Sequence, residues 1–195
     1  MNLDVLNELG KRLYLTVEDV AQITGVKPES ARVTCARYAR RGVFIRIKND
    51  FYVLAHKWNS YARNDYFRLA GHLQVPSYIS FLSALAYYGL TTQVPGLFFE
   101  SAALKRSRRF SVRDAAFSYY KLRKKYFFDF TREGGFFIAR REKAFVDSVF
   151  LASFGKYSLD INAIDVSKLD RGRLRKIIRI YPARTQQMMG ALCGI

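Results

Sequence analysis

Residues 16–54 decide the fold of the N-terminal part of the chain, and they read TVEDVAQITGVKPESARVTCARYARRGVFIRIKNDFYVL. Thr16 suits the N-cap of a helix, because its hydroxyl can accept a bond from the first turn and the acidic residues that follow suit the positive end of the helix dipole. Gly25 can adopt the left-handed conformation of a tight turn, and Pro28 favours the first position of a new helix. We therefore expect a helix, a turn and a second helix that runs from Pro28 to about Arg41.

The second helix has two chemically different sides. Helical periodicity predicts a packing side made of Ala31, Thr34, Cys35 and Tyr38. It predicts an outer side made of Glu29, Val33, Ala36, Arg37 and Arg40, with Ser30 and Arg32 at the flanks. Two β-rich runs then follow, residues 43–47 and 51–54, around a polar turn at hairpin spacing. This order of elements predicts a winged helix-turn-helix in which the hairpin is the wing.

A winged helix-turn-helix is typical of proteins that bind double-stranded DNA. The outer residues in the first half of the second helix are our candidates for contact with bases, namely Ser30, Val33 and Arg37. The remaining cations are candidates for contact with phosphates, namely Arg32, Arg40, Arg41, Arg46 and Lys48. The alternative interpretation is an ordinary amphipathic helix with a solvated basic face.

The charge of the whole chain favours a polyanionic partner. There are 33 Lys and Arg residues against 16 Asp and Glu, which gives a formal net charge of +17 and an isoelectric point near 10.1. Residues 1–55 contain nine of the basic and six of the acidic residues, so most of the excess lies beyond them. The two cysteines indicate no disulfide framework, and neither a signal peptide nor a membrane span is predicted. We therefore expect a cytoplasmic protein with no membrane partner.

The fold class predicted is α+β. We expect a winged helix-turn-helix domain at 1–55, a connecting helix or linker at 56–75, and a mixed C-terminal domain at 76–195. Ser77 or Ser80 should cap a helix that stops at Gly89. A small, mostly antiparallel sheet is predicted from strands at 98–104, 115–122, 126–130 and 135–139, followed by helices at 142–154 and 166–181, the last closed by Pro182.

Two segments of the C-terminal part resemble the AbiEi family of antitoxins. One is PSYISFLSALAYYGL at residues 76–90, a Ser-Ala-Leu helix that ends in Gly-Leu, and the other is REKAFVD at residues 141–147, with an Asp four residues after the Lys. Together with the winged helix-turn-helix, the resemblance covers nearly the whole chain.

This resemblance implies an antitoxin and transcriptional autorepressor of a type IV toxin-antitoxin, or abortive infection, operon that serves in phage defence. In that family the N-terminal domain binds inverted repeats in double-stranded DNA upstream of the operon. The C-terminal domain is required to counteract a nucleotidyltransferase toxin, by direct contact or by function. An inverted repeat suits a dimer or two copies on the DNA. The alternative is a stand-alone winged-helix regulator without a toxin partner, whose C-terminal domain senses a signal or dimerises.

Three basic clusters in the C-terminal domain are candidate surfaces for flanking DNA, RNA or an acidic face of the toxin, although each could be a solvated face. The first cluster consists of Lys105, Arg106, Arg108 and Arg109. The second consists of Lys121, Arg123, Lys124 and Lys125. The third consists of Arg171, Arg173, Arg175, Lys176 and Arg179.

Signals for an enzyme are weak in this sequence. Glu142 at a helix start complements the dipole, and Lys143 with Asp147 is an i to i+4 pair expected on an exposed face, where it is worth a few tenths of a kcal/mol. The nuclease pattern PD-(D/E)xK needs one residue between its acid and its Lys, and here the two are adjacent. Histidines and cysteines form no spaced metal-ligand set, and there is no Gly-rich phosphate loop. We expect no catalysis, no cofactor and no metal, and the 16 Phe and 13 Tyr leave RNA binding as an alternative.

Overall fold

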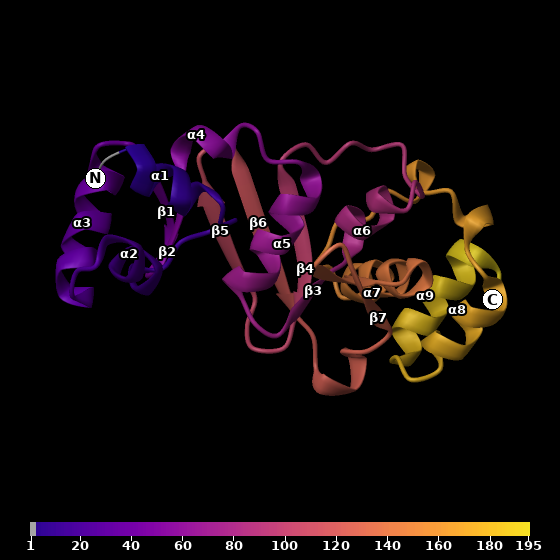
Figure 1. The fold of residues 1–195 in the computed structure, drawn as a ribbon. Helices are drawn as coiled ribbons and strands as arrows, with labels where there is room; N and C mark the ends of the chain where they lie inside the picture. Colours follow the sequence, from indigo (N-terminus) through magenta and orange to yellow (C-terminus); the bar gives the residue numbers. More distant parts are fainter. Residues whose placement is uncertain (1–2) are drawn as a thin grey trace. The chain divides into compact units, whose positions relative to one another are not determined.

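The structure is a computed structural model that describes residues 3–195, drawn in Figure 1. These residues are α+β, as predicted, with nine α-helices, a two-stranded antiparallel sheet and a six-stranded mixed sheet. They form two compact units. The first unit comprises the described residues up to Leu69 together with Ser111–Arg113, and the second comprises Ala70–Phe110 and Asp114–Ile195. The segment 56–75, expected as a connection, is thus divided between the two units.

The first unit begins with a helix, α1, that the sequence did not predict, and the two predicted helices and the predicted hairpin then follow in order. Its elements are α1 (Leu3–Gly10), α2 (Val17–Thr24), α3 (Pro28–Arg40), β1 (Phe44–Lys48), β2 (Phe51–Leu54), α4 (Ala55–Trp58) and the start of α5 (Arg63–Leu73). The expected connecting helix is therefore two helices, α4 and α5, separated by a short loop.

Local chemistry explains where α2 and α3 begin and end. Thr16 Oγ1 accepts a bond from the Asp19 amide at 3.1 Å, and the Asp19 carboxylate accepts from the Thr16 amide at 2.8 Å, which forms a capping box. Gly25 ends α2 with a φ of 70°, a left-handed conformation that suits glycine. Pro28 occupies the first turn of α3. All three expectations are confirmed.

The hairpin is tied directly to the helices of the first unit. Asp50 Oδ1, in the hairpin turn, accepts a bond from the Val17 amide at 2.7 Å. Leu15 and Tyr52 exchange two backbone hydrogen bonds of 2.7 and 2.9 Å, so residue 15 forms a short bridge to β2. Ala31, Cys35 and Tyr38 from α3 are buried in the same core cluster as residues from α1, α2 and both strands. The position of the hairpin beside α2 is therefore fixed by bonds as well as by packing.

The six-stranded sheet of the chain is mixed, which corrects the expectation of a mostly antiparallel one. Strand order is β5-β6-β4-β3-β8-β7. The pairs β3/β4 and β7/β8 are antiparallel, whereas β3/β8 and β4/β6 are parallel. The strands are β3 (Ser77–Ile79), β4 (Phe98–Ala103), β5 (Arg108–Val112), β6 (Ala115–Lys121), β7 (Phe130–Glu133) and β8 (Phe136–Ala139). Strand order depends on long-range pairing, which short aromatic runs do not specify.

One predicted strand is wrong. Residues 124–126 form the short 3-10 helix η1 (Lys124–Tyr126), and β7 begins only at Phe130. The backbone of Asp129 has a φ of 56°, which interrupts an extended chain before that strand. The Tyr126 ring instead stacks on the Tyr181 ring, with centroids 4.5 Å apart. Aromatic residues here fill a core between irregular segments rather than alternate along a strand.

The helices of the second unit also differ from expectation. They are α6 (Phe81–Tyr87), α7 (Arg141–Ser153), α8 (Arg171–Ile178) and α9 (Ala183–Cys193), with 3-10 turns η2 (Ile161–Ala163) and η3 (Val166–Lys168). The single helix predicted at 166–181 is wrong, because Asp170 caps a new helix by accepting from the Arg173 amide at 3.0 Å. Pro182 was expected to close that helix, but α8 ends at Ile178 and Pro182 directly precedes the unpredicted α9. None of the described helices is long and apolar enough to cross a membrane.

Helix α7 is enclosed rather than amphipathic. It packs against α6, α8, α9 and β8, and all residues from 142 to 149 are buried. The expectation of an exposed Lys143–Asp147 pair is therefore wrong, since both side chains are fully buried. A helix covered on several sides has no solvent face for an i to i+4 pair to occupy.

The buried pair is surrounded by partners from other elements. Lys143 Nζ donates to Asp147 Oδ1 and, at 2.9 Å, to the Tyr78 hydroxyl. Asp147 Oδ2 accepts from the Tyr78 hydroxyl at 2.9 Å and from the Ser80 hydroxyl at 2.8 Å. The ammonium also lies 5.2 Å from the centre of the Phe128 ring. Burial raises the pKa of Asp147 and lowers the pKa of Lys143, while the bonds between and around them oppose both shifts.

We predict that Asp147→Leu lowers the free energy of unfolding by about 3–5 kcal/mol, because it leaves the Lys143 ammonium buried without its counter-charge. The double variant Lys143→Met/Asp147→Leu should be more stable than Asp147→Leu alone, since no charge then remains to be compensated. Urea unfolding followed by near-ultraviolet circular dichroism measures both. A double variant that is less stable than the single one would contradict this account of the pair.

Candidate nucleic-acid interface

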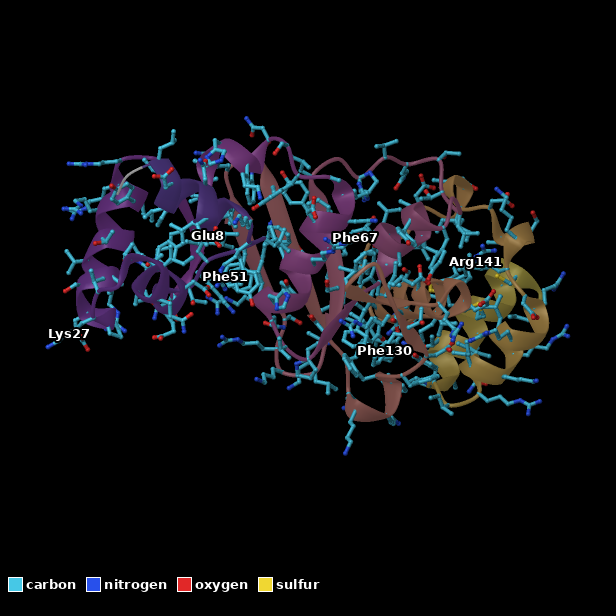
Figure 2. All side chains as sticks on the ribbon, viewed as in Figure 1. Glu8, Lys27, Phe51, Phe67, Phe130 and Arg141 are labelled. Carbon is cyan, nitrogen blue, oxygen red and sulfur yellow. The ribbon has the colours of Figure 1, made fainter. Side chains whose placement is uncertain are left out.

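The outer side of α3 is a continuous exposed surface. Ser30, Arg32, Val33, Ala36, Arg37, Arg40 and Arg41 are exposed, while the opposite side of the helix is buried. Figure 2 shows nitrogen-tipped side chains around α3, with Lys27 extending away from the turn before the helix. Val33 is 64% exposed, so an apolar side chain lies in solvent among the cations. The two sides of the helix match the sequence prediction.

Two acidic residues near α1 and α2 are already paired with other cations. Glu8 pairs with Lys11 at 2.5 Å, and Asp19 pairs with Arg12 at 2.6 Å. Within residues 3–195, no acidic side chain forms an ion pair with Arg32, Arg37, Arg40 or Arg41. These four exposed arginines along α3 and at its C-terminal end make this surface positive. That field attracts a polyanion.

The cations of the hairpin are held by the hairpin itself. Arg46 is exposed, and its Nη2 donates to Asn49 Oδ1 at 2.7 Å across the turn. Lys48 is half-buried, with its ammonium 5.4 Å from the centre of the Phe51 ring. These contacts keep both charges close to the tip of β1–β2.

Cys35 lies on the opposite, buried side of α3. Burial raises the pKa of its thiol to about 11, so the group stays protonated and packs as a small apolar side chain. The surface and the core of α3 therefore have separate chemistry.

Two of the three basic clusters in the second part of the chain are exposed. Lys105, Arg106, Arg108 and Arg109 lie exposed at the end of the β4–β5 connection and on β5, and Lys121, Arg123, Lys124 and Lys125 lie exposed from the end of β6 to η1. The Arg108 guanidinium is 4.4 Å from the centre of the Phe110 ring. Both clusters can meet an anion without breaking an ion pair that the structure records.

The third cluster does not form one solvated face. Arg173 pairs with Asp129 at 2.6 Å and with Glu142 at 3.6 Å, and Arg171 donates to the carbonyl oxygens of Cys193 and Gly194. These two arginines connect α8 to other elements of the second unit. The exposed members that remain are Arg175, Lys176 and Arg179.

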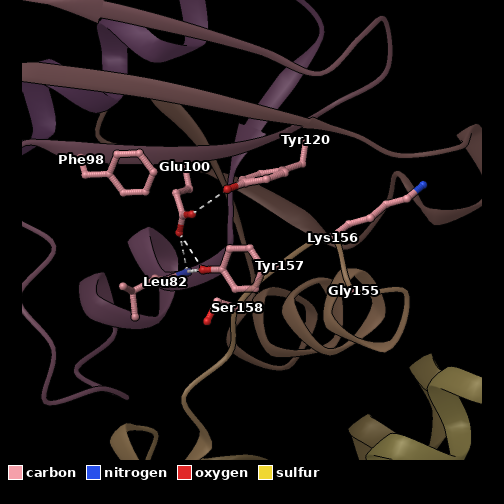
Figure 3. A pocket seen from close by; sticks show the side chains of 8 residues that line it. All are labelled: Leu82, Phe98, Glu100, Tyr120, Gly155, Lys156, Tyr157 and Ser158. Carbon is pink, nitrogen blue, oxygen red and sulfur yellow. Dashed lines mark hydrogen bonds between the residues drawn. The ribbon is translucent and has the colours of Figure 1, made fainter.

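Sequence reasoning missed a buried carboxyl group in β4. Glu100 is 2% exposed and lies at a hollow of about 580 Å³ between β4, β6, α6 and the segment after α7 (Figure 3). Its Oε2 accepts from the Tyr157 hydroxyl at 2.9 Å and from the Leu82 amide at 3.1 Å, and its Oε1 accepts from the Tyr120 hydroxyl at 3.3 Å. The signal that could have found it is an acid within the otherwise apolar or small strand FFESAA.

Burial determines the protonation of this group. It raises the pKa of Glu100 to about 7, although the bonds from Tyr157, Tyr120 and the Leu82 amide favour the ionised form. The Tyr120 hydroxyl, next to the same carboxyl, has its pKa raised to about 12 by burial and by the charge of Glu100. Glu100 therefore changes charge near neutral pH.

No group of three or more His, Cys, Asp and Glu side chains that could hold a metal ion occurs in the part of the chain that the structure describes. The acid Glu142, considered above beside Lys143, connects α7 to α8. Its Oε1 accepts from the Asp170 amide at 3.2 Å, at the start of α8.

Comparisons with known proteins address the fold. No protein-family model matches the chain, and no curated protein matches it. Among solved structures, the chain is similar to the crystal structure of the RV2827C protein from Mycobacterium tuberculosis, with a TM-score of 0.64 at 14% sequence identity. The superposition covers 98% of this chain and 75% of that protein, so the similarity in fold extends over both units.

We predict a pH dependence of stability that depends on Glu100. Its pKa is about 7 in the folded protein and ordinarily 4.5, so between these values the folded state keeps a proton that the unfolded state releases. The free energy of unfolding should therefore fall as the pH rises through this range, by up to about 3 kcal/mol. In Glu100→Gln, which cannot release this proton, the free energy of unfolding should not show this fall.

Urea unfolding of the wild type and of Glu100→Gln at about pH 5 and about pH 8 measures the difference. The matched control is Asp114→Asn, which removes an exposed carboxylate and should keep the wild-type pH dependence. If the free energies of unfolding of the wild type and Glu100→Gln changed equally with pH, burial in the folded protein would not be keeping the Glu100 carboxyl protonated.

Proposed function

We propose that the protein binds double-stranded DNA through its first unit, as a winged helix-turn-helix with α3 as the recognition helix and the β1–β2 hairpin as the wing. The observation that carries this proposal is the outer side of α3, which is exposed and whose arginines form no ion pair with any acidic side chain among residues 3–195. An ordinary amphipathic helix with a solvated basic face, the alternative interpretation, would not require a basic hairpin to be bonded beside it. Here both positive elements belong to one core.

The dimensions of α3 suit the major groove. Its 13 residues span about 20 Å, and the major groove of B-DNA is about 12 Å wide, which admits a helix. In this arrangement Ser30 and Arg37 reach base edges, and the exposed Val33 offers methyl groups to the methyl group of thymine. An arginine can donate two bonds to one guanine, so Arg37 is the strongest candidate for sequence discrimination.

The remaining cations serve the phosphate backbone. We assign this role to Arg32, Arg40, Arg41, Arg46 and Lys48, which flank the outer face of α3 or lie near the tip of the hairpin. The bond between Asp50 and the Val17 amide supports the proposal, because it holds the hairpin turn at a fixed place beside α2. Such a wing can meet the same duplex as α3 without a folding step on binding.

The resemblance to AbiEi antitoxins extends this proposal. We propose that the DNA is an inverted repeat upstream of the protein's own operon, and that the protein represses this operon and counteracts a nucleotidyltransferase toxin encoded in it. The two segments that carry the resemblance, 76–90 and 141–147, meet in the interior through the bond between Ser80 and Asp147. They therefore support a shared C-terminal architecture, and contact with a toxin would fall to exposed surfaces such as the cluster at Lys105 to Arg109.

Titration of fluorescent DNA from the region upstream of the gene, with scrambled DNA as competitor, tests the DNA-binding proposal. We expect tight binding that depends on sequence and weakens with salt, since each neutralised phosphate releases counterions. Equal affinity for both DNAs would leave only charge-driven binding and would refute a sequence-specific repressor.

We predict that Arg37→Ala lowers affinity for the specific site by about 1–3 kcal/mol and reduces the ratio of specific to scrambled binding. Lys48→Ala should instead weaken both equally and reduce the slope of the salt dependence by about one. The matched control is Lys11→Ala, which removes one charge that is paired with Glu8. An unchanged specificity ratio in Arg37→Ala would remove Arg37 from the base-contacting set.

We predict that co-expression with the neighbouring nucleotidyltransferase restores growth, and that charge reversal at Lys105, Arg106, Arg108 and Arg109 reduces this rescue while operator affinity persists. Growth assays and the DNA titration measure the two activities separately. Operator binding without any rescue would indicate a stand-alone regulator.

A further inference from the structure

The second unit contains a hollow that the DNA-binding proposal does not use. It has a volume of about 770 Å³ and lies between the end of β6, the segment through η1, the end of α7 and Pro182. This volume falls within the range of about 300–1,000 Å³ that is typical of small-molecule sites. All of its lining residues belong to the second unit.

One wall of the hollow is aromatic. Phe154 is 41% exposed, and its ring packs edge-on against Phe150, with centroids 5.5 Å apart. Phe150 is half-buried and packs against the buried Tyr126 at 4.8 Å, so the exposed ring rests on other aromatic side chains. The Arg184 guanidinium lies 5.7 Å from the centre of the Phe154 ring. This wall offers a flat, supported surface on which a planar ring can stack.

The rim of the hollow is cationic. Lys121, Arg123 and Lys156 line it and are exposed, and no side chain that lines it is acidic. In the described part of the chain, the side chains of these three cations have no recorded ion pair or hydrogen bond. Figure 3 shows the Lys156 amine pointing away from the Glu100 carboxyl in the neighbouring hollow, which shares Lys156 and Tyr120 as lining residues.

A ligand that contacts both the aromatic wall and the cationic rim carries an aromatic ring and a negative charge. Three unpaired cations at one side suit a phosphate group, since arginine and lysine bind phosphate by charge-assisted bonds. A supported exposed ring suits a nucleobase, which can stack on it whatever its sequence. We propose that this hollow binds a nucleoside phosphate, with the base against Phe154 and the phosphate held by Lys121, Arg123 and Lys156.

The same chemistry can come from a free nucleotide or from the unpaired end of a nucleic-acid strand. Titration calorimetry with the full-length protein at low salt separates these sources. The ligands are ATP, GTP, CTP and UTP in one series, a short single-stranded RNA in a second, and inorganic triphosphate as the anion without a base. To lower the contribution of the first unit, the protein carries Arg37→Ala in every titration, and a blunt DNA duplex measures the binding that remains through the phosphate contacts of that unit.

We expect nucleotides or single-stranded RNA to bind more tightly than inorganic triphosphate. Phe154→Ala should weaken binding about tenfold, whereas Phe154→Trp should retain it, because the loss is that of a stacking surface. Lys121→Gln/Arg123→Gln should also weaken binding and reduce its salt dependence. The three residues altered, Lys121, Arg123 and Phe154, are exposed, and far-ultraviolet circular dichroism confirms the fold of each variant.

Two control variants match these changes. Phe137→Ala removes another exposed aromatic side chain, 48% exposed on β8, and Arg132→Gln removes an exposed charge on β7. Neither lines the hollow, and both should bind like the parent protein. Binding by nucleotides alone or by RNA alone supports the site and identifies the source of the ligand. Binding only to the duplex, equal binding of inorganic triphosphate and nucleotides, or equal affinities of Phe154→Ala and Phe137→Ala would overturn the proposal.

Discussion

The buried ion pair of Lys143 and Asp147 is the constraint on which the second unit depends. Two charges taken out of water are tolerated only where other groups replace the lost solvent bonds. Tyr78 from β3 and Ser80 from the start of α6 supply those bonds, and the Tyr181 hydroxyl, after α8, lies 3.5 Å from Asp147. Any shift of α7 along or about its axis would break several of these contacts at once. The pair thus sets how the sheet and the helices around α7 meet.

In the first unit, polar groups form hydrogen bonds and ion pairs with partners of the same unit. The capping box of Thr16 and Asp19 spans three residues, and Asp50 satisfies a backbone amide at the start of α2. Glu8 pairs with Lys11, and Asp19 pairs with Arg12. Because these backbone amides and carboxylates already have partners, the arginines of α3 stay exposed on one side of the helix. A basic surface of this kind is suited to a polyanion rather than to internal pairing.

The two hollows of the second unit lie next to each other but differ in chemistry. One contains the Glu100 carboxyl, whose pKa is raised to about 7 by burial, and the other is rimmed by cations. Tyr120 and Lys156 line both. Neither hollow lies on the surface of α3, so the second unit has chemistry of its own.

Sequence alone determined the elements whose causes are local: the cap at Thr16, the turn at Gly25, the start of α3 at Pro28, the hairpin that follows and the two sides of α3. It also predicted the α+β class and the position of most of α7. Only the tertiary structure decided the parallel pairings of β3 with β8 and β4 with β6, and the burial of Lys143, Asp147 and Glu100. The physical reason is that caps and turns depend on neighbours within a few residues, whereas strand order and the environment of a charge depend on segments brought together from far along the chain.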